Sequence, residues 1–193
     1  MTPRAIIIAG PNGSGKTTIA REYLQTHRLE YLSADEIAEE LAPGEFERVR
    51  LQAGREFFAR LSERISEGRS FLAETTLAGR GFQRILDRLR DARYSITMIF
   101  VFVDSAEMCV WRVRERTRKG GHAVPEADVI RRFHRSIGNF WNLYRPYAER
   151  WHLIYNGSNQ AQEVAVGNDI GIAQRDEPLY QAFLALVGEH GHE

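Results

Sequence analysis

The residue pattern with the most specific chemical meaning lies near the N-terminus, directly after a short apolar run. It reads Gly-Pro-Asn-Gly-Ser-Gly-Lys-Thr over residues 10–17 and matches the G-x-x-x-x-G-K-[ST] pattern in full. In that pattern, glycines let backbone N–H groups approach phosphate oxygens, and the positive end of the following helix favours an anion. The sequence therefore predicts a loop that binds the phosphates of a nucleotide. We expect its contacts to come from Gly10, Asn12, Gly13, Ser14, Gly15, Lys16, Thr17 and Thr18.

Three side chains at the end of this loop have distinct chemical uses. Lys16 is a compact charge on a flexible stem that can follow the β- and γ-phosphates. The hydroxyl of Thr17 can ligate Mg²⁺, and Thr18 can reach the α-phosphate. A tight glycine turn that holds no ligand would require neither lysine nor threonine here.

Acidic residues follow the second strand-like run, at residues 31–33. A carboxylate of Asp35 or Glu36, placed at the same edge of a sheet as the loop, can accept the proton of an acceptor hydroxyl that attacks the γ-phosphate. The alternative is that Asp35 caps the next helix, with Ser33 as a rival cap. Position alone leaves both interpretations open.

A third acidic position ends the strand-like run at residues 71–74. Glu74 and Thr75 could hold a substrate sugar hydroxyl or complete the water shell of a Mg²⁺ ion. They could also cap the helix expected after Gly79. Because an acidic residue that ends a buried strand needs a partner, we favour a functional role for Glu74.

Asp104 follows the longest apolar run, residues 96–103, and resembles the acidic end of a second nucleotide-binding strand. Together with Ser105 it would also make a good helix cap. Asp104 is therefore a secondary candidate for a Mg²⁺ ligand, after Thr17 and Glu74.

Residues 112–135 hold eight basic and three acidic side chains, interrupted by the glycines and histidine of residues 120–122. Adjacent glycines between helices indicate a mobile lid, and arginines beside it could neutralise charge on a transferring phosphoryl group. Arg112 and Arg116 lie one helical turn apart and share a face, while other arginines are expected to be solvated charges. Without a second histidine or cysteine at ligand spacing, His122 is expected in a turn or in contact with substrate.

Strand-like apolar runs and segments with helical spacing alternate along the chain. The runs lie at residues 5–9, 31–33, 71–74, 96–103 and 153–155, and helical spacing is found at 46–65, 82–89 and 125–148. Such alternation favours a parallel sheet with right-handed crossovers. We therefore expect an α/β fold: a P-loop NTPase-type, doubly wound, mainly parallel sheet flanked by helices, with a helical lid at about residues 112–135.

The pattern is weaker after residue 159. Residues 164–166 and 170–173 are expected to form short edge strands, and residues 178–187 a terminal helix. We expect residues 160–193 to be a C-terminal appendage of one domain that comprises residues 1–193.

The composition limits the function further. The 26 basic and 26 acidic residues cancel, which argues against nucleic acid and against an anionic membrane surface as partners. The single cysteine, Cys109, excludes a disulfide framework, and the longest apolar run is far shorter than the roughly 18 residues of a membrane span. We expect a cytoplasmic protein.

Taken together, these segments resemble the zeta-toxin family of P-loop kinases and its short chromosomal relatives. The matching segments are residues 8–18, 34–37, 71–77, Arg112-Val113 with Arg116, 119–125, 130–132, 135–136 and 139–140. The resemblance implies ATP-dependent phosphorylation of a nucleotide sugar, UDP-N-acetylglucosamine in the toxins, on a sugar hydroxyl. It also implies that Asp35 is the general base, Lys16 the phosphate clamp, and Arg116 with a neighbouring lid arginine the cations that stabilise the transition state. Glu74 and Thr75 would contact the substrate.

Three hypotheses follow. The leading one is a small-molecule kinase that uses ATP and Mg²⁺. A kinase that acts on the 5′-hydroxyl of a polynucleotide would need a basic groove with exposed aromatic residues, and the zero net charge argues against it. The third is a nucleotide-dependent switch or toxin-like module that acts by binding a protein partner, such as an antitoxin.

Overall fold

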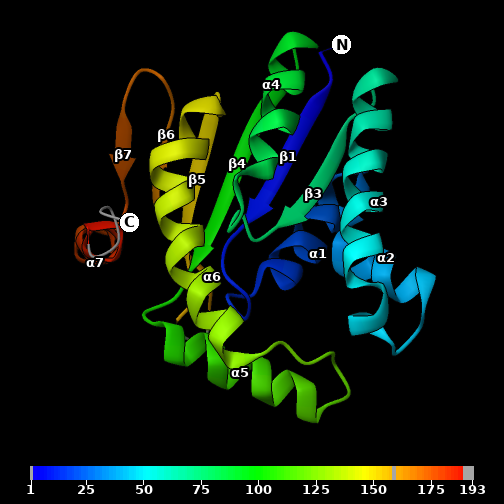
Figure 1. The fold of residues 1–193 in the computed structure, drawn as a ribbon. Helices are drawn as coiled ribbons and strands as arrows, with labels where there is room; N and C mark the ends of the chain where they lie inside the picture. Colours follow the sequence, from blue (N-terminus) through cyan, green and yellow to red (C-terminus); the bar gives the residue numbers. More distant parts are fainter. Residues whose placement is uncertain (1, 158–159, 189–193) are drawn as a thin grey trace.

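A seven-stranded mixed sheet forms the centre of the molecule in the computed structural model, which describes residues 2–157 and 160–188 (Figure 1). The strands are β1 (Arg4–Ala9), β2 (Glu30–Ser33), β3 (Phe71–Thr75), β4 (Ser95–Phe102), β5 (Arg150–Tyr155), β6 (Gln162–Gly167) and β7 (Ile172–Gln174). They lie in the order β2-β3-β1-β4-β5-β6-β7. The first five of these pair in parallel, while β6 and β7 pair antiparallel. The carboxyl ends of the five parallel strands therefore meet at one edge.

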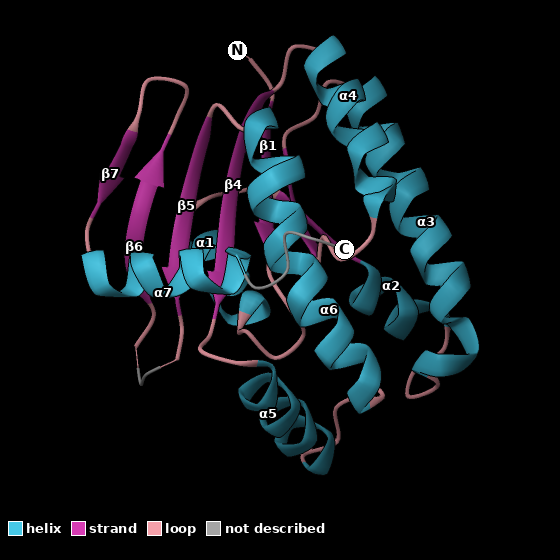
Figure 2. Ribbon diagram, turned by 60° about the vertical axis from the view of Figure 1, so that its left-hand side comes forward, coloured by secondary structure: helices cyan, strands magenta, loops and turns pink. Residues whose placement is uncertain are grey.

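Helices cover both faces of this sheet (Figures 1 and 2). They are α1 (Lys16–Thr26), α2 (Ala34–Leu41), α3 (Phe46–Ser66), α4 (Gln83–Asp91), α5 (Ala106–Arg118), α6 (Glu126–Asn139) and α7 (Glu177–Gly188). Helix α1 packs on one face, and α3, α4, α6 and α7 pack on the other. The expected α/β fold with a mainly parallel sheet is confirmed.

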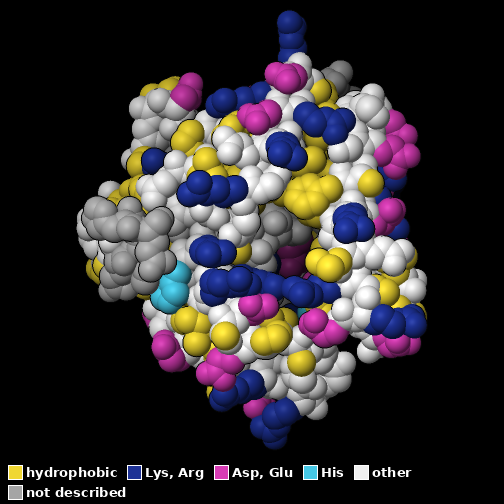
Figure 3. All heavy atoms as spheres, in the orientation of Figure 1, with side chains coloured by type: hydrophobic (Ala, Val, Ile, Leu, Met, Phe, Trp, Pro, Cys, Tyr) yellow, Lys and Arg dark blue, Asp and Glu magenta, His cyan; other side chains and the backbone are white. Residues whose placement is uncertain are grey.

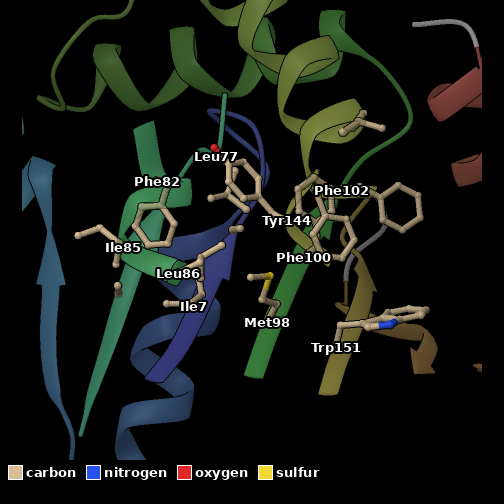
Figure 4. Close-up of a cluster of buried hydrophobic side chains, with 14 of the residues drawn as sticks. Ile7, Leu77, Phe82, Ile85, Leu86, Met98, Phe100, Phe102, Tyr144 and Trp151 are labelled. Atoms are coloured by element: carbon tan, nitrogen blue, oxygen red, sulfur yellow. The ribbon is translucent and has the colours of Figure 1, made fainter. Parts of the chain in front are cut away.

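The side-chain alternation of β1 explains why its sequence is apolar from Ala5 to Ala9. Ile6 and Ile8 point to the face that α1 covers, while Ala5, Ile7 and Ala9 point to the larger core on the other face. Successive side chains of a strand point to opposite faces, so a strand covered on both sides has no polar positions. Figure 4 shows part of the larger core, where Ile7, Met98 and Phe100 lie in one cluster with the aromatic side chains of Phe82 and Tyr144.

The segment expected as a C-terminal appendage continues the sheet. The two expected edge strands form β6 and β7, and the expected terminal helix forms α7. Phe183 of α7 is buried, with its ring centroid 6.0 Å from that of Phe100. Residues 189–193 of the expected appendage lie outside the described residues.

Within residues 2–157 and 160–188, the chain forms no helix with both the length and the apolar character that crossing a membrane requires.

Phe140 is a sensitive test of the core. Its ring stacks on Phe100 with centroids 4.2 Å apart, and it is fully buried. We expect Phe140→Ala to lower the free energy of unfolding by about 3–5 kcal/mol. Trp111→Ala, at a side chain 61% exposed, should change it by less than about 0.5 kcal/mol. Urea denaturation of both variants measures this, and equal losses would contradict the packing described.

Candidate functional site

A cleft of about 580 Å³ opens at the carboxyl edge of the parallel strands. Its walls come from the loop at residues 10–17, from α2 and α3, from the end of β3, and from α5 and α6. Figure 3 shows lysine and arginine side chains gathered around a hollow on this side of the molecule. This edge is where ligands of open α/β sheets bind.

The loop at residues 10–17 joins β1 to α1 and is tightly enclosed. Gly13 and Gly15 have φ angles of +81° and +98°, which L side chains rarely adopt. A Cβ at Gly13 would lie 2.7 Å from the carbonyl oxygen of Cys109, and one at Gly15 would lie 2.1 Å from Nδ2 of Asn156. Close packing against the backbone therefore requires glycine at position 13, and the positive φ favours glycine at both positions. Gly10 follows β1 directly, and the predicted contacts Asn12, Thr17 and Thr18 line the cleft.

Asn156 fixes the loop from outside and was not found by sequence reasoning. Its Nδ2 donates a hydrogen bond of 2.8 Å to the carbonyl oxygen of Ser14. The signal that could have found it is its position directly after the parallel strand β5, at the same edge as the loop.

Lys16 is buried inside the loop, where its Nζ donates a 2.8 Å hydrogen bond to the carbonyl oxygen of Pro11. Burial lowers the pKa of Lys16, and the negative charges of Glu74 and Asp35 oppose this effect in part. The ammonium group therefore has a carbonyl oxygen as its hydrogen-bond partner and two carboxylates nearby, and phosphate oxygens would supply the charge that compensates its burial.

Glu74 is held by two hydroxyl groups at the end of β3. Oγ1 of Thr17 donates to its Oε1 at 3.1 Å, and the hydroxyl of Tyr31 donates to its Oε2 at 2.5 Å. Burial raises the pKa of Tyr31, and the negative charge of Glu74 raises it further, so the phenol keeps its proton and remains a donor. This oxygen-rich arrangement beside the loop fits Mg²⁺, which prefers oxygen ligands and keeps several waters.

The structure does not bring Asp104 to the cleft, contrary to the prediction of a Mg²⁺ ligand there. Both carboxylate oxygens accept from the hydroxyl of Tyr155 at 2.9 Å, which holds the side chain toward β5. Ser105, rather than Asp104, caps α5 by accepting from the backbone N–H of Met108. Among the described residues, no group of three or more His, Cys, Asp or Glu side chains is arranged to hold a metal ion.

Ser33 caps α2, and this leaves the carboxylate of Asp35 available to the cleft. Oγ of Ser33 accepts from the backbone N–H of Asp35 at 3.2 Å, while the side chain of Asp35 lines the cleft and is 45% exposed. Burial raises the pKa of Asp35, but the hydrogen bond with His122 and the charges of His122, Lys16 and Arg116 outweigh it and lower the pKa overall. Asp35 is therefore ionised near neutral pH and can accept a proton.

Glu36 is exposed and lies outside the residues that line the cleft. Consecutive residues of a helix differ in direction by about 100°. Because Asp35 faces the cleft, its neighbour faces away from it. The prediction of Glu36 as a substrate contact is not supported by this placement.

His122 connects the loop between α5 and α6 to the cleft. Its Nε2 lies 3.3 Å from Oδ2 of Asp35 and 3.3 Å from Nη2 of Arg116, and its ring stacks on Phe46 at 4.0 Å. With a proton on Nε2 the ring donates to Asp35, and without one it accepts from Arg116.

Arginines from the expected lid form one wall of the cleft. Arg112 and Arg116 reach it from α5, and Arg132 reaches it from α6, where its Nη1 donates to Oδ1 of Asn12 at 3.3 Å. Nε of Arg116 is buried and has no hydrogen-bond partner among the described residues. Arg114 is exposed and pairs with Glu126.

The side chains that line the cleft carry a net positive charge, although the chain has none, and Glu47 and Asp128 outside the lining pair with three of the basic side chains. Its acidic side chains are Asp35 and Glu74. Its basic side chains are Lys16, Arg50, Arg112, Arg116, Arg131, Arg132 and Arg135. An excess of five positive charges matches a ligand that carries several phosphates.

A family model described as an AAA domain matches residues 6–138, a segment that includes the phosphate-binding loop and the arginines of α5 and α6. A protein of Haemophilus influenzae, strain ATCC 51907, described as uncharacterized, is 25% identical over 131 residues. That match covers 68% of this chain and 92% of the relative.

Three solved structures share the fold. AvrRxo1-ORF1:-ORF2 with ATP has a TM-score of 0.75 at 15% identity, over 94% of this chain and 63% of that one. A structure of the PezAT chromosomal toxin–antitoxin system of Streptococcus pneumoniae has a TM-score of 0.64 at 16% identity, over 100% of this chain and 88% of that chain. Shikimate kinase from Acinetobacter baumannii has a TM-score of 0.52 at 19% identity, over 100% of this chain and 97% of that chain. The chain has a nucleotide-binding, P-loop kinase-like fold.

Tyr31→Phe tests the hydroxyl clamp on Glu74. We expect the Mg²⁺ concentration that half-saturates the ATP-bound protein to rise about 2- to 10-fold, because Glu74 loses one hydrogen bond to its charged carboxylate. Isothermal titration with Mg²⁺ measures this, and ATP binding without Mg²⁺ should be unchanged. Tyr23→Phe on α1, outside the cleft, is the matched control. Equal Mg²⁺ dependence in both variants would show that the clamp is irrelevant to the metal.

His122→Ala tests the cause of the low pKa of Asp35. Removing the hydrogen bond and the charge of His122 should raise that pKa, because burial is then opposed only by Lys16 and Arg116. A carboxyl ¹³C NMR titration measures the pKa directly. His152→Ala, which removes a partner of Glu163 on β5 and β6, should leave Asp35 unaffected. An unchanged Asp35 titration in His122→Ala contradicts the assignment.

Proposed function

We propose that this chain, which belongs to the AAA-domain family, is a kinase that transfers the γ-phosphate of ATP to a hydroxyl group of a small molecule. The observation that carries this proposal is the ionised carboxylate of Asp35, which shares one cleft with the phosphate-binding loop. A carboxylate can accept a proton from water or from an acceptor hydroxyl, and the open cleft beside Asp35 leaves room for a molecule that carries such a hydroxyl.

Each group in the cleft has a role in this reaction. Asp35 accepts the proton of the acceptor hydroxyl as its oxygen forms a bond to the γ-phosphorus. The bond from that phosphorus to the oxygen it shares with the β-phosphate breaks, and ADP departs with the electron pair. Lys16, Arg112 and Arg116, which all line the cleft, balance the charge on the phosphoryl oxygens.

Thr17 and Glu74 would hold Mg²⁺, Thr17 through its hydroxyl and Glu74 through its carboxylate or a bound water. When bound, the ion neutralises charge on the β- and γ-phosphates. Tyr31 keeps the carboxylate of Glu74 oriented toward the loop.

The acceptor that we propose is a nucleotide sugar such as UDP-N-acetylglucosamine. The resemblance to zeta toxins supports this choice, as does the positive charge in excess of what one triphosphate needs. Glu74, Thr75 and His122 are the proposed contacts to the acceptor. The same resemblance supports an antitoxin-like protein as a partner that blocks the cleft.

The test is a reaction of purified protein with ATP, Mg²⁺ and a panel of UDP-sugars, analysed by mass spectrometry. We expect ADP and one sugar nucleotide that gains the mass of a phosphoryl group. ADP formed at the same rate without any acceptor would favour the switch hypothesis, and phosphate transferred only to a 5′-hydroxyl oligonucleotide would favour the polynucleotide kinase. Either outcome contradicts the proposal.

Asp35→Asn should reduce kcat about 10²- to 10⁴-fold, the usual contribution of general base catalysis. Binding of ATP, measured by calorimetry, should be unchanged because the phosphates contact the loop and the arginines. Asp91→Asn, at the end of α4 before β4 begins, is a control that should retain wild-type turnover. Full turnover by Asp35→Asn would remove Asp35 as the base.

A further inference from the structure

Helix α3 carries two neighbouring stripes with different surroundings. The first is buried in the core and consists of Val49, Ala53, Phe57, Leu61 and Ile65. The second repeats every four residues and lines the cleft; we call it the cleft stripe, and it consists of Phe46, Arg50, Gly54 and Phe58. The first stripe packs the helix on the core, and Phe46 of the second stripe also packs against that core, whereas Arg50 and Gly54 are not part of it.

Gly54 is the least expected member of the cleft stripe. It lies in the interior of a 21-residue helix, where glycine costs about 1 kcal/mol relative to alanine. Its φ is not positive, and an added Cβ would meet no atom within 4 Å. Neither the backbone nor the packing requires glycine here, so the space above Gly54 belongs to the cleft.

The side chains on either side of Gly54 offer two kinds of contact. Phe58 is 38% exposed, although large apolar side chains are usually buried, and its ring rests against Phe57 with centroids 5.6 Å apart. Arg50 is 44% exposed, and its partner Glu47 lies 3.5 Å away and is itself mostly exposed. The stripe thus presents a flat apolar surface beside a weakly paired cation.

The stripe begins next to the reacting groups. Phe46 stacks on His122, which in turn contacts Asp35. From Phe46 to Gly54 the helix rises about 12 Å. A molecule whose hydroxyl lies at Asp35 would therefore place its remote end over Gly54.

We propose that the cleft stripe is the subsite for the remote end of the acceptor: a planar ring lies over Gly54 against Phe58, and an anionic group of the same molecule pairs with Arg50. This inference rests on the proposed function, because it assigns the part of the acceptor that does not react. It makes Gly54 a determinant of specificity, since any larger side chain would occupy the place of the ring.

The test measures binding rather than turnover. The protein is saturated with Mg²⁺ and a non-hydrolysable ATP analogue, so that the phosphate-binding loop is occupied. Two probes are then titrated by calorimetry: UDP-N-acetylglucosamine, which carries the planar ring of uracil, and N-acetylglucosamine 1-phosphate, which has the sugar ring but no planar ring. Wild-type protein should bind the first at least about fivefold more tightly, the low end for a ring stacked on an aromatic side chain.

Gly54→Leu should bring the two affinities together and leave that of the ATP analogue unchanged. Gly138→Leu is the matched control, because this helical glycine of α6 also has open space at its Cβ but lies outside the cleft lining. Gly54→Ala should unfold at a higher temperature than wild type, which shows that the position is not a folding requirement.

Arg50→Gln should weaken both probes, since both carry phosphate, whereas Arg48→Gln, at an exposed pair with Glu45, should weaken neither. The proposal is overturned if wild type binds neither probe, or if Gly54→Leu keeps the preference for the ring. If Gly54→Leu loses the preference for the planar ring but the wild-type protein transfers no phosphoryl group, the subsite is upheld and the proposed kinase activity is rejected. If the wild-type protein transfers the phosphoryl group but Gly54→Leu keeps the preference for the planar ring, the kinase activity is upheld and the subsite is rejected.

Discussion

The burial of one ammonium group governs the layout of the site. Lys16 is removed from water inside a loop that is itself pressed against α5 and held by Asn156. A buried cation is costly without compensating negative charge, and the carboxylates that oppose this cost are those of Asp35, in the first turn of α2, and Glu74, in β3. The loop, the two carboxylates and the position of a phosphate ligand therefore follow from one electrostatic requirement.

Small hydroxyl side chains determine which carboxylates remain available. Ser33 satisfies the start of α2, so Asp35 is not used for capping, and Thr17 and Tyr31 together orient Glu74. These contacts are individually modest, of the order of 1 kcal/mol each. Their value lies in position, because they turn two carboxylates toward the cleft before any ligand arrives.

The phosphate-binding loop and the order of strands and helices could be predicted because they depend on local patterns: glycine spacing, apolar runs and helical periodicity. The choice between neighbouring acids could not, because Asp35 and Glu36 differ only in the direction that α2 gives them. Asp104 depends on a tyrosine 51 residues away, and Asn156 contacts a loop 142 residues away. On α3 the helical spacing of the buried residues could be predicted, but nothing in that spacing indicated that the adjacent stripe lines the cleft. Contacts between distant segments carry no periodic signal.

The uneven distribution of charge affects how a ligand reaches the cleft. Seven basic and two acidic side chains line the hollow, whereas the other described residues carry nineteen basic and twenty-two acidic side chains and are net negative. A neutral protein with separated charge is an electric dipole, and its field turns an approaching anion toward the positive end. Capture of polyphosphates should thus be accelerated by attraction over a distance set by the ionic strength, about 8 Å in physiological salt. The same field repels the anion from the rest of the surface, so the molecule guides its ligand without carrying net charge.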